Sequence, residues 1–153
     1  MMIFLPLIIL AAVLLALFRW VTYRQSEDRF YRLAWLVFLV GVFLMFWSNG
    51  AVGIIGASNN DINMLYNALL GVGLLGCIGL RKQRLGLALV MLVLDFLMVL
   101  VLAVALVGDM GHSGPKWPYD AVVLTVFFSA FWTVAAILFY RSHQALTSVN
   151  RAG

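Results

Sequence analysis

Charged side chains are scarce in this sequence. Lysine, arginine, aspartate and glutamate together make up 10% of the 153 residues, whereas 65% of the residues are hydrophobic. Soluble domains carry charge on about a quarter of their residues. The scarcity of charge therefore excludes an ordinary soluble domain and indicates an integral membrane protein, in which lipid faces most of the surface.

Cysteine and histidine are also rare. The single cysteine, Cys77, excludes an intrachain disulfide, a CxxC redox motif and a thiolate metal cluster. The two histidines, His112 and His143, lie outside the apolar runs, so a haem held by histidines within the membrane is not expected. Asp109, Met110 and His112 form a weak metal-binding pattern, for which a solvated glycine-rich loop is the favoured interpretation. The sequence predicts neither a metal nor a cofactor.

Five apolar runs approach the roughly 20 residues that a helix needs to cross a membrane. The first run is short, and because no small-residue cleavage site follows it, we expect an uncleaved anchor rather than a signal peptide. The sequence predicts an all-α, polytopic transmembrane helix bundle that forms a single domain over residues 1–153. The expected spans cover residues 3–18, 33–57, 62–80, 85–107 and 121–140.

Basic residues divide unevenly between the two sides of these runs. Nine of the ten follow the first, third or fifth run, and Lys116 alone follows the fourth. Because positive charge in short loops marks the cytoplasmic side, we expect an outside N-terminus and a cytoplasmic C-terminus. The net charge of +4 is thus explained by topology, and no nucleic-acid partner is predicted.

The loop between the first two runs mixes arginine with aromatic residues over residues 19–32. This mixture is typical of a membrane interface that faces anionic lipid. General lipid anchoring is the favoured interpretation, with a dedicated phosphoinositide-type or partner site as the alternative. In the same loop Ser26, Glu27 and Asp28 suit a helix N-terminus, and Ser58 with Asp61 matches a capping box before the third span.

Asp95 is the only ionisable side chain within an apolar run, and it lies near the middle of residues 87–107. A charged carboxylate at that depth is costly, so we expect a neutral, hydrogen-bonding acid at pH 7. A rise of 1.5 Å per residue places Ser129 at the same depth, about 15 Å from the cytoplasmic face. Together with three asparagines nearer the outside, these residues are the candidate ligand or ion site: Asp95, Asn49, Asn63, Asn67 and Ser129.

Two arrangements of these polar groups remain open. They form either a cavity that opens outward or a polar seam that holds helices together; a pore through the membrane has no support. The trio of Ser48, Asn49 and Gly50 leaves a second choice, because the helix either continues through it or breaks at Asn49–Gly50.

Small residues in the third and fifth runs are the candidates for helix packing. The GVGLLG segment at 71–76 follows no strand, so it is not a dinucleotide-binding motif and is expected to let a neighbouring helix approach. Threonines on the fifth run recur on one helix face with Ser129, and their hydroxyls bond either their own i−4 carbonyls or other helices. The packing candidates are Gly71, Gly73, Gly76, Gly79, Thr125 and Thr133.

The pattern WSNGAVGIIG at 47–56, followed by NxxNMLY at 60–66 and a glycine-rich span with a basic turn, resembles a group of small uncharacterised bacterial inner-membrane proteins with four spans. The likeness covers about residues 40–140, and the first span is an addition to that four-helix unit. The resemblance implies a multi-pass protein of the bacterial inner membrane, and it implies no activity.

The leading functional hypothesis is a small accessory or structural subunit that packs with other membrane helices, in self-association or within a larger membrane complex. The alternative is a small oligomeric transporter, coupled to protons or ions through Asp95, and the third is a protein that binds lipid or quinone. An enzyme is not expected, because intramembrane aspartyl chemistry needs two acids and only Asp95 is deep. The expected partners are the lipid bilayer and other membrane subunits.

Overall fold

The computed structural model of this chain is all helical, as the sequence predicts. It describes residues 4–23, 28–57, 59–112, 114 and 116–152, and no strand occurs in these ranges. The helices are α1 (Phe4–Thr22), α2 (Arg29–Ala51), α3 (Asn63–Gly79), α4 (Arg84–Val107) and α5 (Tyr119–Ala152).

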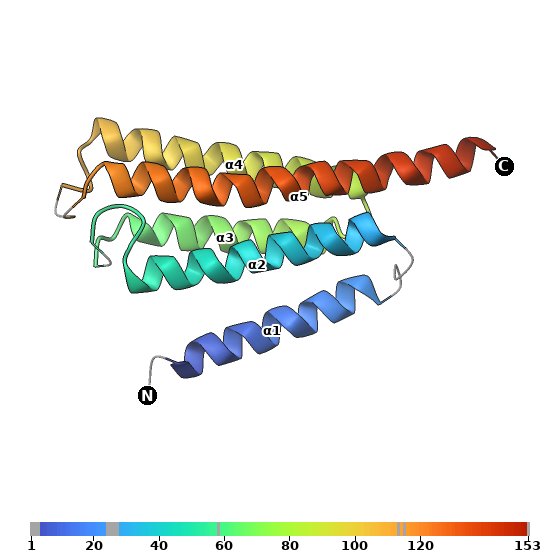
Figure 1. Cartoon of the computed structure of the whole chain (residues 1–153), viewed down its shortest axis with the longest axis horizontal. Helices are drawn as coiled ribbons and strands as arrows, with labels where there is room; N and C mark the ends of the chain where they lie inside the picture. Colours follow the sequence, from blue (N-terminus) through green and yellow to red (C-terminus); the bar gives the residue numbers. More distant parts are fainter. Residues whose placement is uncertain (1–3, 24–27, 58, 113, 115, 153) are drawn as a thin grey trace.

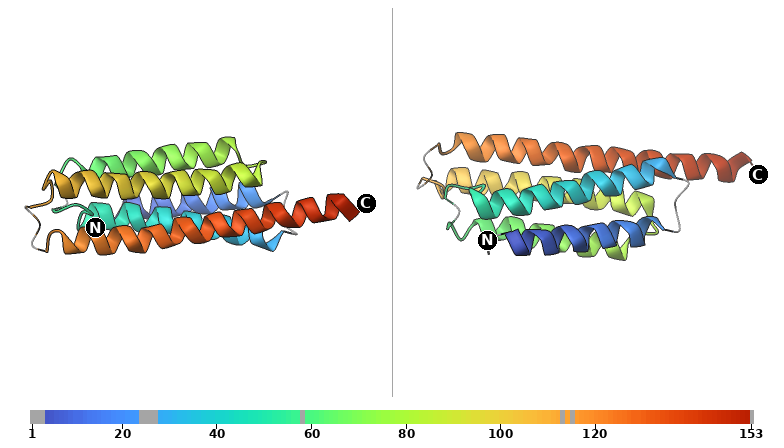
Figure 2. Two further views of the ribbon diagram at one scale, coloured as in Figure 1. Left: turned by 90° about the horizontal axis from the view of Figure 1, so that it is seen from above. Right: turned by 60° about the horizontal axis from the view of Figure 1, so that its bottom comes forward.

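Helices α2 to α5 form a four-helix bundle, and α1 lies on its outside (Figure 1). Around the bundle α2 neighbours α3, α3 neighbours α4, α4 neighbours α5, and α5 neighbours α2, while α1 packs against α2. The two further views show the C-terminal part of α5 projecting past the other helices (Figure 2). α1 begins at one end of the bundle and α5 finishes at the other.

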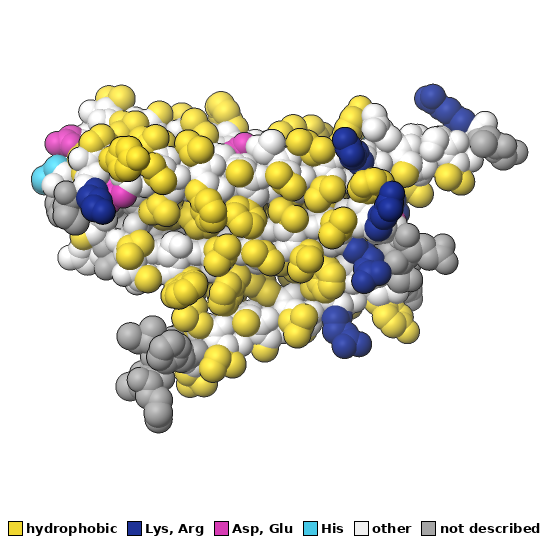
Figure 3. Space-filling model, in the orientation of Figure 1, with side chains coloured by type: hydrophobic (Ala, Val, Ile, Leu, Met, Phe, Trp, Pro, Cys, Tyr) yellow, Lys and Arg dark blue, Asp and Glu magenta, His cyan; other side chains and the backbone are white. Residues whose placement is uncertain are grey.

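Four helices are long and apolar enough to cross a membrane, namely α1, α2, α4 and α5. α3 is also apolar but has only 17 residues, so the structure has four helices of spanning length where the sequence predicts five spans. Hydrophobic side chains cover the surface along the helices, and most basic side chains gather at one end (Figure 3). We call this the basic end; it contains the α1–α2 connection and the α3–α4 turn. The opposite end, which contains the α2–α3 and α4–α5 connections, is the loop end.

The second predicted span, over residues 33–57, differs from α2 at both ends. The helix begins earlier, at Arg29, and it passes through Ser48, Asn49 and Gly50 to end at Ala51. Residues 52–57 are not helical, because Gly53 and Gly56 adopt positive φ angles of 76° and 68° that no helix contains. The polar trio is therefore helical, and the break comes just after it.

Other helix ends also differ from the predicted runs. α5 begins at Tyr119 and continues far past the predicted end at Tyr140, because the polar segment that follows is also helical. α1 continues past Phe18 to Thr22, whose hydroxyl donates to the Phe18 carbonyl at 2.7 Å. The predicted start of the first span at residue 3 lies outside the described residues.

The two predicted capping motifs have different outcomes. Asp28 caps α2, since its carboxylate accepts a hydrogen bond from the Tyr31 N–H at 3.1 Å, whereas Ser26 and Glu27 lie outside the described residues. The second motif is not formed by Asp61, because α3 begins only at Asn63 and its N-cap Ile62 has no side-chain capping bond. Asn60 instead accepts from the Ile62 N–H at 3.2 Å, and Ser58 is not among the described residues.

Buried aromatic rings from α2 and α5 fill the bundle core. Their rings meet edge to face, with centroids 5.7 Å apart for Phe38 and Trp132 and 5.9 Å apart for Trp35 and Phe139. Gly41 makes this approach of α5 possible, because a Cβ atom there would lie 3.0 Å from both the Phe131 Cβ and the Trp132 ring. The packing of α5 against α2 at this point thus depends on a glycine outside the predicted packing set.

We expect Gly41→Val to destabilise the bundle by about 1–3 kcal/mol, because the added methyl groups must displace two bulky side chains of α5. The matched control is Gly71→Val, which makes the same change on α3 where no heavy atom lies within 4 Å of the new Cβ. The measurement is the midpoint of unfolding in detergent, followed by circular dichroism. Equal shifts for the two variants would contradict the assignment of Gly41 to the α2–α5 contact.

Candidate functional site

Asp95 forms a hydrogen-bonded cluster with two hydroxyls of α5. The Ser129 hydroxyl donates to Asp95 Oδ1 at 2.5 Å, and the Thr133 hydroxyl donates to Asp95 Oδ2 at 3.1 Å. Ser129 and Thr133 lie four residues apart, so they share one face of α5 and both reach the same carboxyl group. The hydrogen bond to Ser129 joins the two residues that the helix rise places at equal depth.

This cluster lies on the outside of the bundle. Asp95 and Ser129 are partly exposed and Thr133 is exposed, whereas the adjacent Trp132 is fully buried. Trp132 turns inward, where its indole N–H approaches the Met98 sulfur at 2.7 Å. The boundary between core and surface therefore runs between neighbouring residues of α5, with the acid on the surface side.

Apolar side chains surround the cluster on this surface. On α4 Leu92 is 50% exposed and Phe96 is 67% exposed, and on α5 Val126 is 64% exposed. As the neutral acid that the sequence predicts, Asp95 carries one O–H donor and has acceptor positions beyond the two that the hydroxyls occupy. The acid thus retains hydrogen-bonding capacity beyond these two bonds.

A second polar cluster lies at the loop end, between α2 and α3. The Asn49 amide nitrogen donates to the Asn63 carbonyl at 2.8 Å and to Asn67 Oδ1 at 3.1 Å. Both of these partners are acceptors, so they fix the amide orientation and leave Asn49 Oδ1 facing elsewhere. This oxygen is buried without a hydrogen-bond partner among the described residues.

Asn63 fastens the connection after α2 to the start of α3. Its side-chain oxygen accepts from the N–H groups of Ile54 at 3.1 Å and Ile55 at 2.9 Å, and its amide nitrogen donates to the carbonyls of Ile55 at 3.3 Å and Ala57 at 3.0 Å. Asn63 is 4% exposed, and Ile54 and Ile55 are fully buried. One amide therefore satisfies four backbone groups of a buried, irregular segment.

The structure brings the five predicted site residues together in two groups. Asp95 and Ser129 lie in the first group, and the second consists of Asn49, Asn63 and Asn67. The described hydrogen bonds of the first group link α4 with α5, and those of the second link α2, α3 and residues 54–57. These bonds do not form one continuous polar seam.

The predicted packing residues also divide. Gly73 faces Leu94, and a Cβ there would lie 3.1 Å from a Leu94 methyl carbon; at Gly76 a Cβ would make ordinary contact with Val90 at 3.5 Å. Gly71 and Gly79 face open space, since no heavy atom lies within 4 Å of a Cβ built on either. They point away from the neighbouring helices because they lie on the other side of α3 from Gly73.

The two threonines of the packing set have different surroundings. Thr125 is 1% exposed, and its hydroxyl lies 3.5 Å from the Tyr66 hydroxyl of α3 inside the bundle. Thr133 joins Asp95 on the surface instead. The sequence leaves open whether these hydroxyls bond their own i−4 carbonyls or other helices. The described hydrogen bonds are made to other helices.

A third cluster, which the sequence does not predict, lies at the basic end. Arg84 at the start of α4 pairs with the Asp28 carboxylate, and it donates to the Ser142 hydroxyl at 2.9 Å and carbonyl at 3.1 Å. The Ser142 hydroxyl donates in turn to Asp28 at 2.8 Å. The cluster connects the starts of α2 and α4 with α5; the capping position of Asp28 is its only local signal, since the partners come from distant parts of the chain.

At the loop end the weak metal pattern has other contacts. Asp109 accepts a hydrogen bond from the Trp117 indole N–H at 2.7 Å, and the His112 ring nitrogen Nδ1 lies 2.9 Å from the Asp109 carbonyl oxygen. Within the described part of the chain, no group of three or more histidine, cysteine or acidic side chains is placed to hold a metal ion.

A scan against protein-family models and searches of curated proteins and of solved structures found no match to this chain. The functional argument therefore depends on the three clusters themselves. Of these, the Asn63 cluster is buried and the Arg84 cluster is partly buried, and the described hydrogen bonds of both are made within the chain. The Asp95 cluster differs because it lies on the surface, and it is the candidate functional site.

We expect Asn63→Leu to loosen residues 52–57, because it leaves buried backbone groups unpaired, each at a cost of about 1–3 kcal/mol. The measurement is hydrogen exchange at the Ile54 and Ile55 amides, which should become faster in the variant. Asn59→Leu is the control, since Asn59 is an exposed residue of the same connection. Unchanged exchange in Asn63→Leu would contradict the role given to this amide.

We expect Arg84→Met to lower the free energy of unfolding by about 3 kcal/mol, because it leaves the Asp28 carboxylate without its cation. Adding Asp28→Asn to this variant should restore part of the loss, since asparagine retains the capping ability but carries no charge. Chemical unfolding of the single and double variants measures the difference. A double variant less stable than Arg84→Met would show that the ion pair does not dominate this cluster.

Proposed function

We propose that this chain is a small accessory subunit of a membrane complex, and that its α4–α5 surface binds a transmembrane helix of a different protein. The observation that supports this proposal is the surface cluster of Asp95, Ser129 and Thr133, in which Thr133 is exposed and the other two residues are partly exposed. Polar side chains in hydrocarbon are expensive and normally face a protein partner. A partner helix would remove the cluster from lipid.

The chemistry of this surface favours a helix as the partner. Small residues at Ser129 and Ala130 allow a helix backbone to come close, as small residues do in membrane helix pairs. The remaining hydrogen-bonding capacity of Asp95 calls for a polar group, so the partner helix should carry a serine, threonine or asparagine at this depth. The exposed apolar residues around the cluster then pack against the apolar part of that helix.

We propose that all five helices cross the membrane, with the N-terminus outside and the C-terminus in the cytoplasm. The 17 residues of α3 extend over about 26 Å, close to a hydrocarbon thickness of roughly 30 Å. The collection of basic side chains at one end supports this orientation. The bacterial inner membrane follows from the resemblance described above and is part of the proposal.

The transporter hypothesis has less support. A carrier that uses Asp95 with the asparagines needs these residues along one route, whereas their described hydrogen bonds involve different helix pairs. Asp95 also lies towards the surface of the bundle rather than within its core. The accessory function accounts for both facts, because a contact surface requires exposure and a local cluster.

Site-specific photo-crosslinking in native membranes tests the proposed surface. A benzoylphenylalanine at Val126, beside the cluster, should form a discrete adduct with another protein, and the same residue at Ile8 on α1 should not. Both positions are 64% exposed, so the comparison is matched for exposure. Asp95→Leu should reduce the adduct from Val126 several-fold, whereas Asp95→Asn, which still forms hydrogen bonds, should retain much of it.

Three outcomes would contradict the proposal. An adduct of twice the mass of the chain would assign the surface to self-association, equal adducts from Val126 and Ile8 would indicate random collision, and a yield unaffected by Asp95→Leu would remove the cluster from the contact. The unfolding midpoint of Asp95→Leu in detergent serves as the control for folding.

A further inference from the structure

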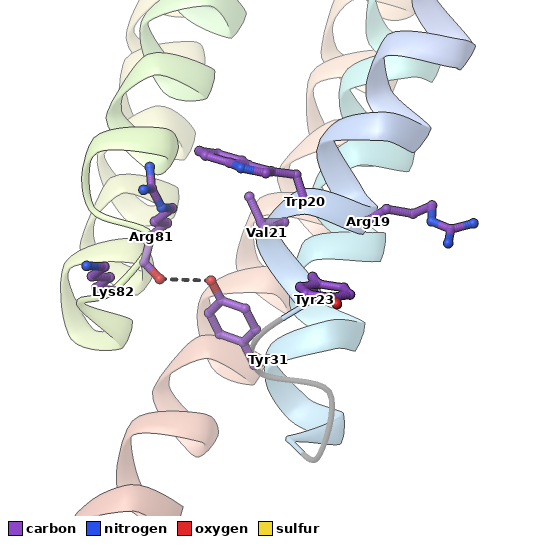
Figure 4. A pocket seen from close by; sticks show the side chains of 7 residues that line it. All are labelled: Arg19, Trp20, Val21, Tyr23, Tyr31, Arg81 and Lys82. Carbon is purple, nitrogen blue, oxygen red and sulfur yellow. Dashed lines mark hydrogen bonds between the residues drawn. The ribbon is translucent and has the colours of Figure 1, made fainter.

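An open cavity lies at the basic end between α1 and the turn that follows α3. Its volume is about 630 Å³. Figure 4 shows the side chains that line it: the last turns of α1 form one side, the α3–α4 turn forms the other, and α2 contributes one tyrosine. The lining residues are Arg19, Trp20, Val21, Tyr23, Tyr31, Arg81 and Lys82.

Arg81 is held in place within this cavity. The Tyr31 hydroxyl donates to the Arg81 carbonyl at 2.8 Å, and Tyr31 itself is fully buried. The Arg81 guanidinium lies 4.2 Å from the centroid of the Trp20 ring, and Trp20 extends from α1 toward it (Figure 4). Stacking on an aromatic face uses the flat side of a guanidinium and leaves its N–H edges available for an anion.

The charge of the cavity is positive. Arg19, Arg81 and Lys82 line it, and none of the described lining residues is acidic. The carboxylate of Asp28, which directly precedes α2, is paired with Arg84 and Ser142. The N–H donors and the positive charge of the described lining residues suit a phosphate group, whose oxygens arginine binds in a bidentate manner.

The position of the cavity indicates the source of that phosphate. It lies where the apolar length of α1 ends, and Trp20 and Tyr23 beside it are 53% and 82% exposed, as expected for aromatic residues at the lipid headgroup level. The part of α1 nearer the loop end presents exposed apolar side chains, including Leu15 at 63%. A lipid whose headgroup occupies the cavity can therefore place its acyl chains along α1.

We propose that this cavity is a binding site for the phosphate headgroup of an anionic phospholipid, with Arg81 and Lys82 as the anion ligands and Trp20 as the residue that positions Arg81. The site requires only the orientation of the basic end toward headgroups. It is independent of the partner helix at Asp95, which lies at mid-length of α4. Such a lipid would fill the space between α1 and the α3–α4 turn.

Spin-labelled lipids measure this preference directly. The full chain is reconstituted in phosphatidylcholine vesicles, and the motionally restricted fraction of labelled phosphatidylglycerol is compared with that of labelled phosphatidylcholine. The unmodified chain should prefer phosphatidylglycerol, and Arg81→Gln/Lys82→Gln should reduce the preference by roughly fivefold for each charge removed. Trp20→Leu should produce a smaller loss, because it frees Arg81 without removing its charge.

The matched control is Arg29→Gln/Arg141→Gln, which removes the same charge from exposed positions outside the cavity lining. An equal loss in both double variants would overturn the proposal in favour of a general surface charge effect. Displacement of phosphatidylglycerol by millimolar inorganic phosphate would overturn the lipid source and assign the cavity to a soluble phosphate. Should Arg81→Gln prevent folding, Lys82→Gln alone provides the test, since Lys82 is exposed and must still lower the preference.

Discussion

The need to pair buried backbone groups away from water governs this structure. The connection after α2 shows how strong the requirement is, because Ile54 and Ile55 are fully buried although their backbone is irregular. Asn63 meets the requirement with a single side chain that pairs with backbone groups of both residues and of Ala57. Without such an amide, this segment would need water or a regular helix to satisfy its N–H and C=O groups.

The bundle is fastened by polar clusters at both ends and by aromatic packing between them. At the loop end Asn49 and Asn63 connect α2 with α3, and at the basic end Asp28, Arg84 and Ser142 connect α2, α4 and α5. Between the ends the large rings of α2 and α5 interlock where Gly41 lets them approach. Specific polar contacts thus fix the ends, while close packing stabilises the middle.

Much of this arrangement follows from the sequence, and the remainder depends on contacts that no local pattern records. Apolar length predicts the helices, and helix rise predicts that Asp95 and Ser129 lie at the same depth. The end of α2 could not be predicted, because it follows from the positive φ of Gly53 and the pairing of Asn63 across the connection. The role of Arg84 could not be predicted either, because its partners lie 56 and 58 residues away along the chain.

Depth distinguishes the two outward-facing features of the molecule. Arg81 and Lys82 lie at the end of the bundle, where water and headgroups supply partners for an exposed charge, so their environment favours a lipid phosphate. Asp95 lies midway along α4. In the proposed membrane orientation neither water nor headgroups reach this depth, and only protein supplies a hydrogen-bonding partner. The hydrogen bonds of the Asn63 and Arg84 clusters are made within the chain. The carboxyl group of Asp95, in contrast, has hydrogen-bonding capacity left on the α4–α5 surface. The partner helix proposed above would use this capacity, because a transmembrane helix provides both a polar side chain at the required depth and an apolar surface for the residues around it.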